Sequence, residues 1–268
     1  MGKIALLQLT TSCDIEQNLI SIAQHVEEAA EAGVQLIVLP ENCAFMGEKT
    51  SPLYTIAERK GDGRIQAYLS QIAQRYGVWI VAGTIPIKGL NHRVRASSLV
   101  FDDRGKCVAC YDKIHLFDVV VPHGEQHQES LHIEPGLSVV TVDTPVGCVG
   151  LSVCYDVRFP ELYRQLVLKG AEIFTVPSAF TAVTGLAHWE VLLRARAIEN
   201  LCYVLAPNQN GHHENGRYTY GHSMVVDPWG KIIACAAERT GILTAEIELS
   251  YLKTLRQQFP CNEHHIMA

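Results

Sequence analysis

The sequence predicts an α/β fold in which two similar halves pack their sheets face to face as a layered sandwich. Continuous apolar runs alternate with helical patterns along the chain, and this alternation is typical of α/β domains. Both halves contain the same elements in the same order, and one segment recurs with few changes. Because no linker-like or low-complexity stretch separates the halves, we expect residues 1–268 to form a single pseudo-symmetric domain.

The recurring segment is SLVFDDRGKCVAC at 98–110, which aligns without gaps with SMVVDPWGKIIAC at 223–235. Each copy consists of an apolar run, an Asp-x-x-Gly turn and a second run, which predicts a β-hairpin. Cys107 of the first copy is replaced by Ile232 in the second. We therefore interpret Cys107 and Cys110 as hairpin residues rather than as ligands, and we expect no metal site.

The other elements also occur in pairs. Helices are predicted where apolar residues recur on one helical face, and buried strands where the apolar run is continuous. The first half is predicted to contain a strand over 3–9, a helix over 19–30, a strand within 32–45, a helix over 65–76, a strand over 78–85 and the hairpin over 98–110. The second half is predicted to contain the matching elements over 148–154, 162–167, 169–180, 189–198, 201–208 and 223–235.

Composition excludes several classes of protein. With 48% hydrophobic residues the chain can form a sizeable core, and a net charge of −6 without a Lys/Arg cluster argues against a nucleic-acid surface. No apolar stretch approaches the roughly 18 residues that span a membrane, and the N-terminal stretch lacks a signal-peptide pattern. Nine cysteines without framework spacing indicate reduced thiols and a cytoplasmic location.

Three chemically useful residues follow predicted strands. Glu41 comes after a buried strand, Lys113 follows the first hairpin, and Cys154 ends an apolar strand directly before a helix. Ligands of α/β sheets gather at the carboxyl ends of strands, so these side chains are candidates for one site. Taken singly, Cys154 is more typical of core packing and Lys113 of a solvated side chain.

Together the three residue types suit attack on an amide or nitrile carbon through a covalent thioester or thioimidate. A nearby cation and a helix N-terminus favour the thiolate of Cys154. The carboxylate of Glu41 in a dry site can have a raised pKa and serve first as a base and then as an acid. The ammonium group of Lys113 can stabilise an oxyanion. A scaffold that only binds partners would not need all three, so we expect an enzyme.

Three segments resemble the signature regions of the nitrilase superfamily, the carbon–nitrogen hydrolases. They are LPEN at 39–42, YDKIHLFD at 111–118 and CYDVRFPEL at 154–162, and the resemblance extends in order over about the whole chain. It implies a four-layer αββα sandwich, which agrees with the repeat. It also implies that no metal or organic cofactor is needed.

The resemblance assigns a role to each candidate. Glu41 would be the general base, Lys113 the oxyanion stabiliser and Cys154 the nucleophile. The backbone N–H of Tyr155 would be a second oxyanion donor, and Glu129 would orient Lys113 or the substrate. In the implied cycle, the attack of Cys154 on a carboxamide releases ammonia, and water then hydrolyses the thioester to a carboxylate.

The substrate implied by the resemblance is a small 2-oxo amide whose far end carries a carboxylate. Four second-half segments are most similar to the family's deaminated glutathione amidases; they lie at 177–185, 187–200, 211–217 and 220–230. ω-Amidases, which hydrolyse 2-oxoglutaramate, are less similar in these segments and are the alternative. An enzyme that hydrolyses other small amides or nitriles is favoured still less.

Three residues are predicted to bind this substrate. Arg158, four residues after Cys154, is the candidate partner of the carboxylate, with a structural ion pair as the alternative. The resemblance places Phe180 and Thr184 in the pocket. His212 and His213 could contact a longer, peptide-like substrate, but exposed loop histidines are the favoured interpretation.

The resemblance further implies a homodimer or a higher homo-oligomer. Family members usually continue past the region that corresponds to Phe259 and Pro260, often as an arm that crosses to a partner subunit. The short C-terminal stretch leaves the oligomeric state open but not the chemistry.

Overall fold

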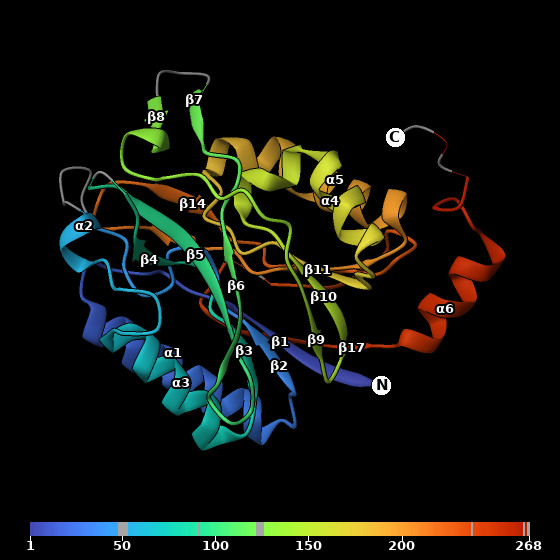
Figure 1. The fold of residues 1–268 in the computed structure, drawn as a ribbon, viewed down its shortest axis with the longest axis horizontal. Coiled ribbons are helices and arrows are strands. Elements are labelled where there is room, and N and C mark those ends of the chain that lie inside the picture. The colour runs from blue at the N-terminus through green and yellow to red at the C-terminus, as the bar shows by residue number, and fades with distance from the viewer. Residues whose placement is uncertain (48–52, 91, 122–125, 237, 265, 267–268) are drawn as a thin grey trace.

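In the computed structural model, two mixed β-sheets lie between two pairs of helices (Figure 1). The structure describes residues 1–47, 53–90, 92–121, 126–236, 238–264 and 266. The helices α1 (Ile15–Glu31) and α3 (Arg64–Tyr76) cover one sheet, and α4 (Pro160–Leu168) and α5 (Ala182–Asn200) cover the other. The predicted αββα sandwich is confirmed, and it places the strand ends of both sheets within reach of one site.

The two sheets repeat the same strand order. In the first sheet it is β17 (Gly241–Ile247), β1 (Gly2–Gln8), β2 (Leu36–Val38), β3 (Trp79–Val81), β5 (Val94–Phe101) and β4 (Ile85–Lys88), with β6 (Cys107–Asp112) also paired to β5. In the second, starting from the equivalent edge, it is β9 (Thr141–Thr144), β10 (Gly147–Leu151), β11 (Ile173–Thr175), β12 (Tyr203–Ala206), β15 (Met224–Val226) and β16 (Ile232–Cys235). The central strands β1–β2–β3 and β10–β11–β12 are parallel, and each group is followed by an antiparallel hairpin. The internal pseudo-two-fold repeat is therefore confirmed.

The two hairpins match in detail. Their registers shift between Val100 and Phe101 in one copy and between the equivalent Val225 and Val226 in the other. In each turn the aspartate Oδ1 accepts backbone N–H groups from two and four residues further on. Cys107 and Cys110 lie on β6 as ordinary strand residues, as predicted.

One feature was not predicted. The strand β9 follows the first hairpin in the chain, yet it pairs with β10 in the second sheet. Likewise β17 follows the second hairpin and pairs with β1 over all seven of its residues. Each half thus contributes the edge strand of the other half's sheet.

Two predicted strands end early, and both corrections concern the site. The strand predicted over 78–85 ends at Val81, because Gly83 turns the chain with φ 53°. A Cβ at Gly83 would lie 1.8 Å from the carbonyl oxygen of Pro40, so glycine is needed for this close approach beside Glu41. The strand predicted over 148–154 ends at Leu151, and Cys154 instead begins a 3₁₀ helix over Cys154–Arg158.

Besides a small cluster of Ala57, Val94, Ala96 and Ile133, the core consists of two large clusters. One fills the space between the sheets and under α4 and α5, and the other packs α1 and α3 onto the outer face of the first sheet. The remaining elements are α2 (Leu53–Ile56), β7 (Asp118–Val120), β8 (Gln126–Gln128), a 3₁₀ turn (Glu129–Leu131), β13 (Asn210–His212), β14 (Tyr218–Tyr220) and α6 (Leu249–Gln258). In the described part of the chain, no helix has the length and apolar character of a membrane span.

Candidate active site

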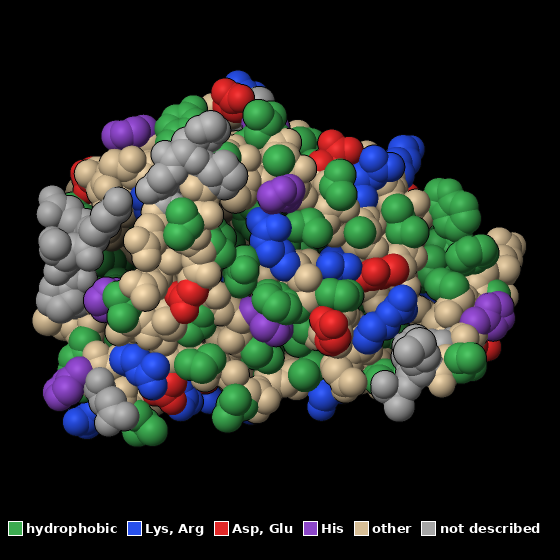
Figure 2. Space-filling model, turned by 90° about the horizontal axis from the view of Figure 1, so that it is seen from above, with side chains coloured by type: hydrophobic (Ala, Val, Ile, Leu, Met, Phe, Trp, Pro, Cys, Tyr) green, Lys and Arg blue, Asp and Glu red, His purple; other side chains and the backbone are tan. Residues whose placement is uncertain are grey.

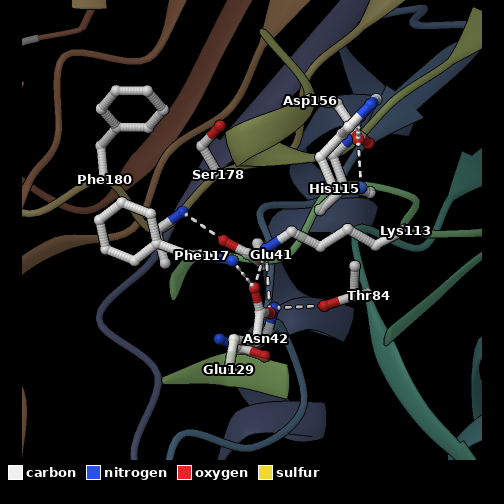
Figure 3. Close-up of polar contacts among 12 residues, drawn as sticks. Glu41, Asn42, Thr84, Lys113, His115, Phe117, Glu129, Asp156, Ser178 and Phe180 are labelled. Carbon is white, nitrogen blue, oxygen red and sulfur yellow. Dashed lines mark hydrogen bonds and ion pairs between the residues drawn. The ribbon is translucent and has the colours of Figure 1, made fainter. Parts of the chain in front are cut away.

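Glu41, Lys113 and Cys154 meet in one cavity, as the sequence predicted. Lys113 follows β6, and its Nζ donates a hydrogen bond of 2.8 Å to Glu41 Oε1. The side chains of Lys113 and Glu41 are only 2% and 6% exposed, so the ion pair is shielded from water. Figure 3 shows Lys113 extending toward Glu41 from the segment that also carries His115.

Glu41 is positioned by residues of the second half of the chain. Its Oε2 accepts the backbone N–H of Ala179 at 2.9 Å, and its backbone carbonyl accepts a hydrogen bond from the side chain of Gln209 at 2.9 Å. The next residue, Asn42, donates its N–H to Thr84 Oγ1 (Figure 3). The carboxylate is therefore fixed by contacts that form only when both halves are folded.

A second carboxylate holds Lys113 from another side. Glu129 lies in the 3₁₀ turn after β8, and both of its oxygens accept hydrogen bonds of 2.9 Å from Lys113 Nζ. Its Oε2 also accepts the N–H of Phe117 at 2.7 Å. The ammonium group thus lies between two carboxylates, and Glu129 contacts Lys113 as expected of an orienting residue.

The charges in this cluster fix the resting protonation state. Burial raises the pKa of Glu41, but the charge and hydrogen bond of Lys113, with a hydrogen bond from Cys154, outweigh it and lower that pKa. Burial lowers the pKa of Lys113, but Glu129 and Glu41 outweigh it and raise that pKa well above its ordinary value. Burial and then Glu41 raise the pKa of Cys154, although Lys113 opposes them.

The resting site accordingly contains a carboxylate, an ammonium group and a neutral thiol. Two expectations were wrong in direction, because the pKa of Glu41 is lowered rather than raised and that of Cys154 is raised rather than lowered. For Glu41 the cause is the charge and hydrogen bond of Lys113, which outweigh burial. For Cys154 the cause is burial, followed by the charge of Glu41, which together outweigh Lys113.

The backbone at Cys154 is strained. This residue has φ 48°, in the left-handed region, and such a conformation costs about 1–3 kcal/mol for a residue other than glycine. Its N–H donates to the carbonyl oxygen of Pro177 at 2.9 Å, which holds the turn in place. The sharp turn after Leu151 brings the thiol to the cavity, where Tyr155 follows it in the first turn of the 3₁₀ helix.

Asp156 links the segment that carries Lys113 to the turn that carries Cys154. The aspartate is fully buried, and its Oδ2 accepts the Tyr111 hydroxyl at 2.7 Å and the Val153 N–H at 2.9 Å. Its Oδ1 accepts the N–H of His115 at 3.0 Å and lies 2.7 Å from His115 Nδ1 (Figure 3). His115 thus has a structural contact and does not line the cavity.

Replacing Asp156 by asparagine should destabilise the protein by about 2–4 kcal/mol, because a neutral amide cannot accept all four of these contacts and leaves buried donors unsatisfied. Denaturant unfolding of Asp156→Asn against Asp103→Asn, an exposed turn residue, measures the difference. Equal stability of the two variants would contradict the linking role of Asp156.

The cavity has a volume of about 370 Å³, within the range of small-molecule sites. Besides the residues above, Arg158, Phe180 and Thr184 line it, as predicted. The Arg158 guanidinium lies 5.7 Å from the Phe180 ring and has no carboxylate partner among the described residues, so the structural ion pair is not found there. The Thr184 hydroxyl is bonded to Thr181 in the cap of α5.

Arg217, which was not predicted from the sequence, also lines the cavity from the turn between β13 and β14. The only signal was a lone arginine at the end of a polar loop sequence. The same turn corrects the interpretation of His213, which is buried and bonded to Thr11 and Thr219 rather than exposed, whereas His212 is exposed as expected.

The chain is similar to known proteins over almost its whole length. The sequence profile of the carbon–nitrogen hydrolase family matches residues 3–257. A deaminated glutathione amidase of Yersinia enterocolitica is 45% identical over 98% of this chain and 93% of its own length. One from Synechocystis is 42% identical over 98% of both chains. The crystal structure of the Caenorhabditis elegans NitFhit protein superposes with a TM-score of 0.92 at 40% identity, over 98% of this chain and 65% of that one.

Proposed function

Because this chain belongs to the carbon–nitrogen hydrolase family, we propose that it is an amidase of deaminated glutathione in which Cys154 is the nucleophile. The observation that carries the proposal is the contact of Lys113 with Glu41 beside the buried thiol of Cys154, in one cavity. The substrate is taken from full-length relatives at 42–45% identity that bear this activity in their names.

The first half-reaction forms the thioester. As sulfur attacks the amide carbon, Glu41 takes the thiol proton, because the hydrogen bond between Cys154 and Glu41 provides the path. A neutral thiol with a raised pKa must lose its proton during attack rather than before it. Lys113 Nζ and the N–H of Tyr155 then stabilise the oxyanion.

The second half-reaction restores the enzyme. Protonated Glu41 gives its proton to the nitrogen as the carbon–nitrogen bond breaks, and the amine leaves. Glu41 then takes a proton from water, whose oxygen attacks the thioester carbon. Collapse of this intermediate releases the carboxylic acid and returns the proton to Cys154.

The identity of the leaving amine corrects the expectation of ammonia. Deaminated glutathione is glutathione without its amino group, and therefore it has no primary carboxamide. The nitrogen of its 2-oxo acyl amide belongs to the cysteinyl residue, so the product is a cysteinylglycine amine. Ammonia is expected only from a primary amide such as 2-oxoglutaramate.

This difference gives a direct test. The purified protein is incubated separately with deaminated glutathione and with 2-oxoglutaramate, and primary amine and ammonia are both measured. We expect amine release from deaminated glutathione, with kcat/KM about tenfold or more above that for 2-oxoglutaramate. Faster ammonia release from 2-oxoglutaramate would support the ω-amidase function instead, and no amine release would overturn the proposal.

We also propose that the protein forms a homodimer or a larger homo-oligomer. Figure 2 views the molecule from the side of α4 and α5, where hydrophobic side chains lie among charged ones. On α5, Leu186 is 80% exposed and Val191 is 68% exposed, and Val183 and Ile198 are each 47% exposed. A group of exposed apolar side chains on one helix supports an interface there. The nine free thiols support a cytoplasmic location.

Replacing Val191 by glutamate should shift the protein toward the monomer, because a charge would have to be desolvated in the interface. Sedimentation velocity of Val191→Glu and of Arg104→Glu, a change in the turn before β6, measures this shift. A monomeric wild-type protein, or a Val191→Glu variant whose assembly has the same mass as that of the wild type, would contradict an interface on this face.

A further inference from the structure

We propose that Arg217 binds the carboxylate of the leaving dipeptide and thereby selects a peptide-like amide over a primary amide. This inference rests on the proposed function, and it adds a binding site for the leaving group.

The cavity contains more positive charge than its own carboxylates use. Among the described residues that line it, the lysine and arginine side chains are those of Lys113, Arg158 and Arg217. Glu41 and Glu129 are both bonded to Lys113. No carboxylate of the described residues forms an ion pair with either guanidinium group, although the charge of Arg217 helps to lower the pKa of Glu41.

The proposed substrate carries two carboxylates, one on each side of the scissile amide. One belongs to the 2-oxo acyl part, and the other is the glycyl carboxylate of the leaving amine. A primary amide such as 2-oxoglutaramate carries only the first. Two guanidinium groups therefore match the longer substrate better than the shorter one.

The Arg217 side chain has a hydrogen-bond donor without a partner among the described residues, and the turn that carries it is held in position. One of its terminal nitrogens donates to the carbonyl oxygen of Ala179 at 3.2 Å, while its buried Nε has no hydrogen-bond partner among the described residues. Its backbone N–H donates to Asn215 Oδ1 at 3.0 Å, and the buried His213 fixes the turn. A carboxylate would satisfy the unpartnered donor, and the rigid turn reduces the ordering needed to bind it.

The positions of Arg158 and Arg217 indicate which of the two substrate carboxylates each one binds. Arg158 lies on the same 3₁₀ helix as Cys154, so it belongs with the acyl part that stays bonded to the sulfur. Arg217 contacts Ala179, whose N–H donates to Glu41. Because Glu41 delivers the proton to the departing nitrogen, the leaving amine lies on this side.

The test compares two substrates that differ only at the glycyl end, namely deaminated glutathione and its analogue with a glycinamide in place of the glycine carboxylate. The wild-type enzyme should prefer the carboxylate by about 10- to 100-fold in kcat/KM, mostly through KM, as expected for a charge-assisted contact. In Arg217→Gln this preference should fall to about one, and Arg217→Lys should keep part of it.

Arg158→Gln is the matched control, because it removes the other guanidinium. It should lower kcat/KM for both substrates and keep the preference for the glycyl carboxylate. A preference retained by Arg217→Gln, or absent from the wild-type enzyme, would overturn the inference and leave the proposed function intact. If the wild-type enzyme released no amine from deaminated glutathione, the proposed function would fail, and the inference with it.

Discussion

Replacement of Cys154 by serine should lower kcat/KM for deaminated glutathione by about 10⁴-fold or more while the protein stays folded. A serine hydroxyl is a far weaker acid than a thiol, and Glu41, whose pKa is lowered by Lys113 against the effect of burial, is too weak a base to remove its proton. Serine has nearly the shape of cysteine, so the strained turn and the hydrogen bond to Pro177 should persist.

A second buried cysteine provides the control. Cys43 lies outside the cavity lining, and its thiol donates to the carbonyl oxygen of Ala82 at 3.2 Å, a contact that serine can reproduce. Cys43→Ser should retain activity within about threefold, whereas circular dichroism should show both variants folded. Turnover by Cys154→Ser within tenfold of the wild-type rate would eliminate Cys154 as the nucleophile.

Replacement of Lys113 by methionine should remove activity and also destabilise the fold by about 3–5 kcal/mol at neutral pH. Breaking a buried ion pair from one side leaves an uncompensated charge, and here two carboxylates lose the cation they share. The activity loss should reach at least about 10²–10³-fold, because an oxyanion donor is lost as well. Activity assays and denaturant unfolding measure the two effects separately.

The pH dependence of stability should also reverse. In the wild-type protein the pKa of Glu41 lies below its ordinary value of 4.5, so this group stabilises the fold above that value and the contribution is lost as pH falls through the lowered pKa. Without Lys113, burial would raise the pKa of Glu41, and the group would then favour the fold below 4.5 and oppose it as pH rises. Lys113→Met should therefore be relatively more stable at pH 5 than at pH 8.

The double variant Lys113→Met/Glu129→Gln separates stability from chemistry. Removing one of the two carboxylates should restore part of the stability at pH 8, yet the oxyanion donor is still missing and activity should not return. If Lys113→Met unfolded at the wild-type denaturant concentration at pH 8, the ion cluster would not have the energetic role assigned to it.

The sequence was sufficient to predict the elements that recur and the residues that follow strands. The repeat of 98–110 at 223–235 predicted the pseudo-symmetry. The predicted strand ends made Glu41, Lys113 and Cys154 candidates for one site, and the family resemblance assigned them to it. The exchange of β9 and β17 could not be predicted, because an edge strand has the same pattern whichever sheet it joins.

Two features of the site depend on distances that a sequence does not contain. Arg217 reaches the cavity from a turn whose position is set by tertiary contacts, so no local pattern distinguished it from a solvated arginine. The pKa directions of Glu41 and Cys154 followed from the burial of both groups and from the direct contact of Lys113 with Glu41. The sequence identified these groups but not how deeply they are buried or which of them are in contact.

The exchanged edge strands have a consequence for how the chain can be divided. A cut in the turn between β9 and β10 would give one fragment that ends with the edge strand of the other fragment's sheet. The second fragment would in turn carry β17, which completes the sheet of the first. Each piece alone would expose the unpaired backbone groups of β1 or β10, so neither half is a self-sufficient folding unit. The two pieces can pair these strands with their native partners only by reassembling with each other.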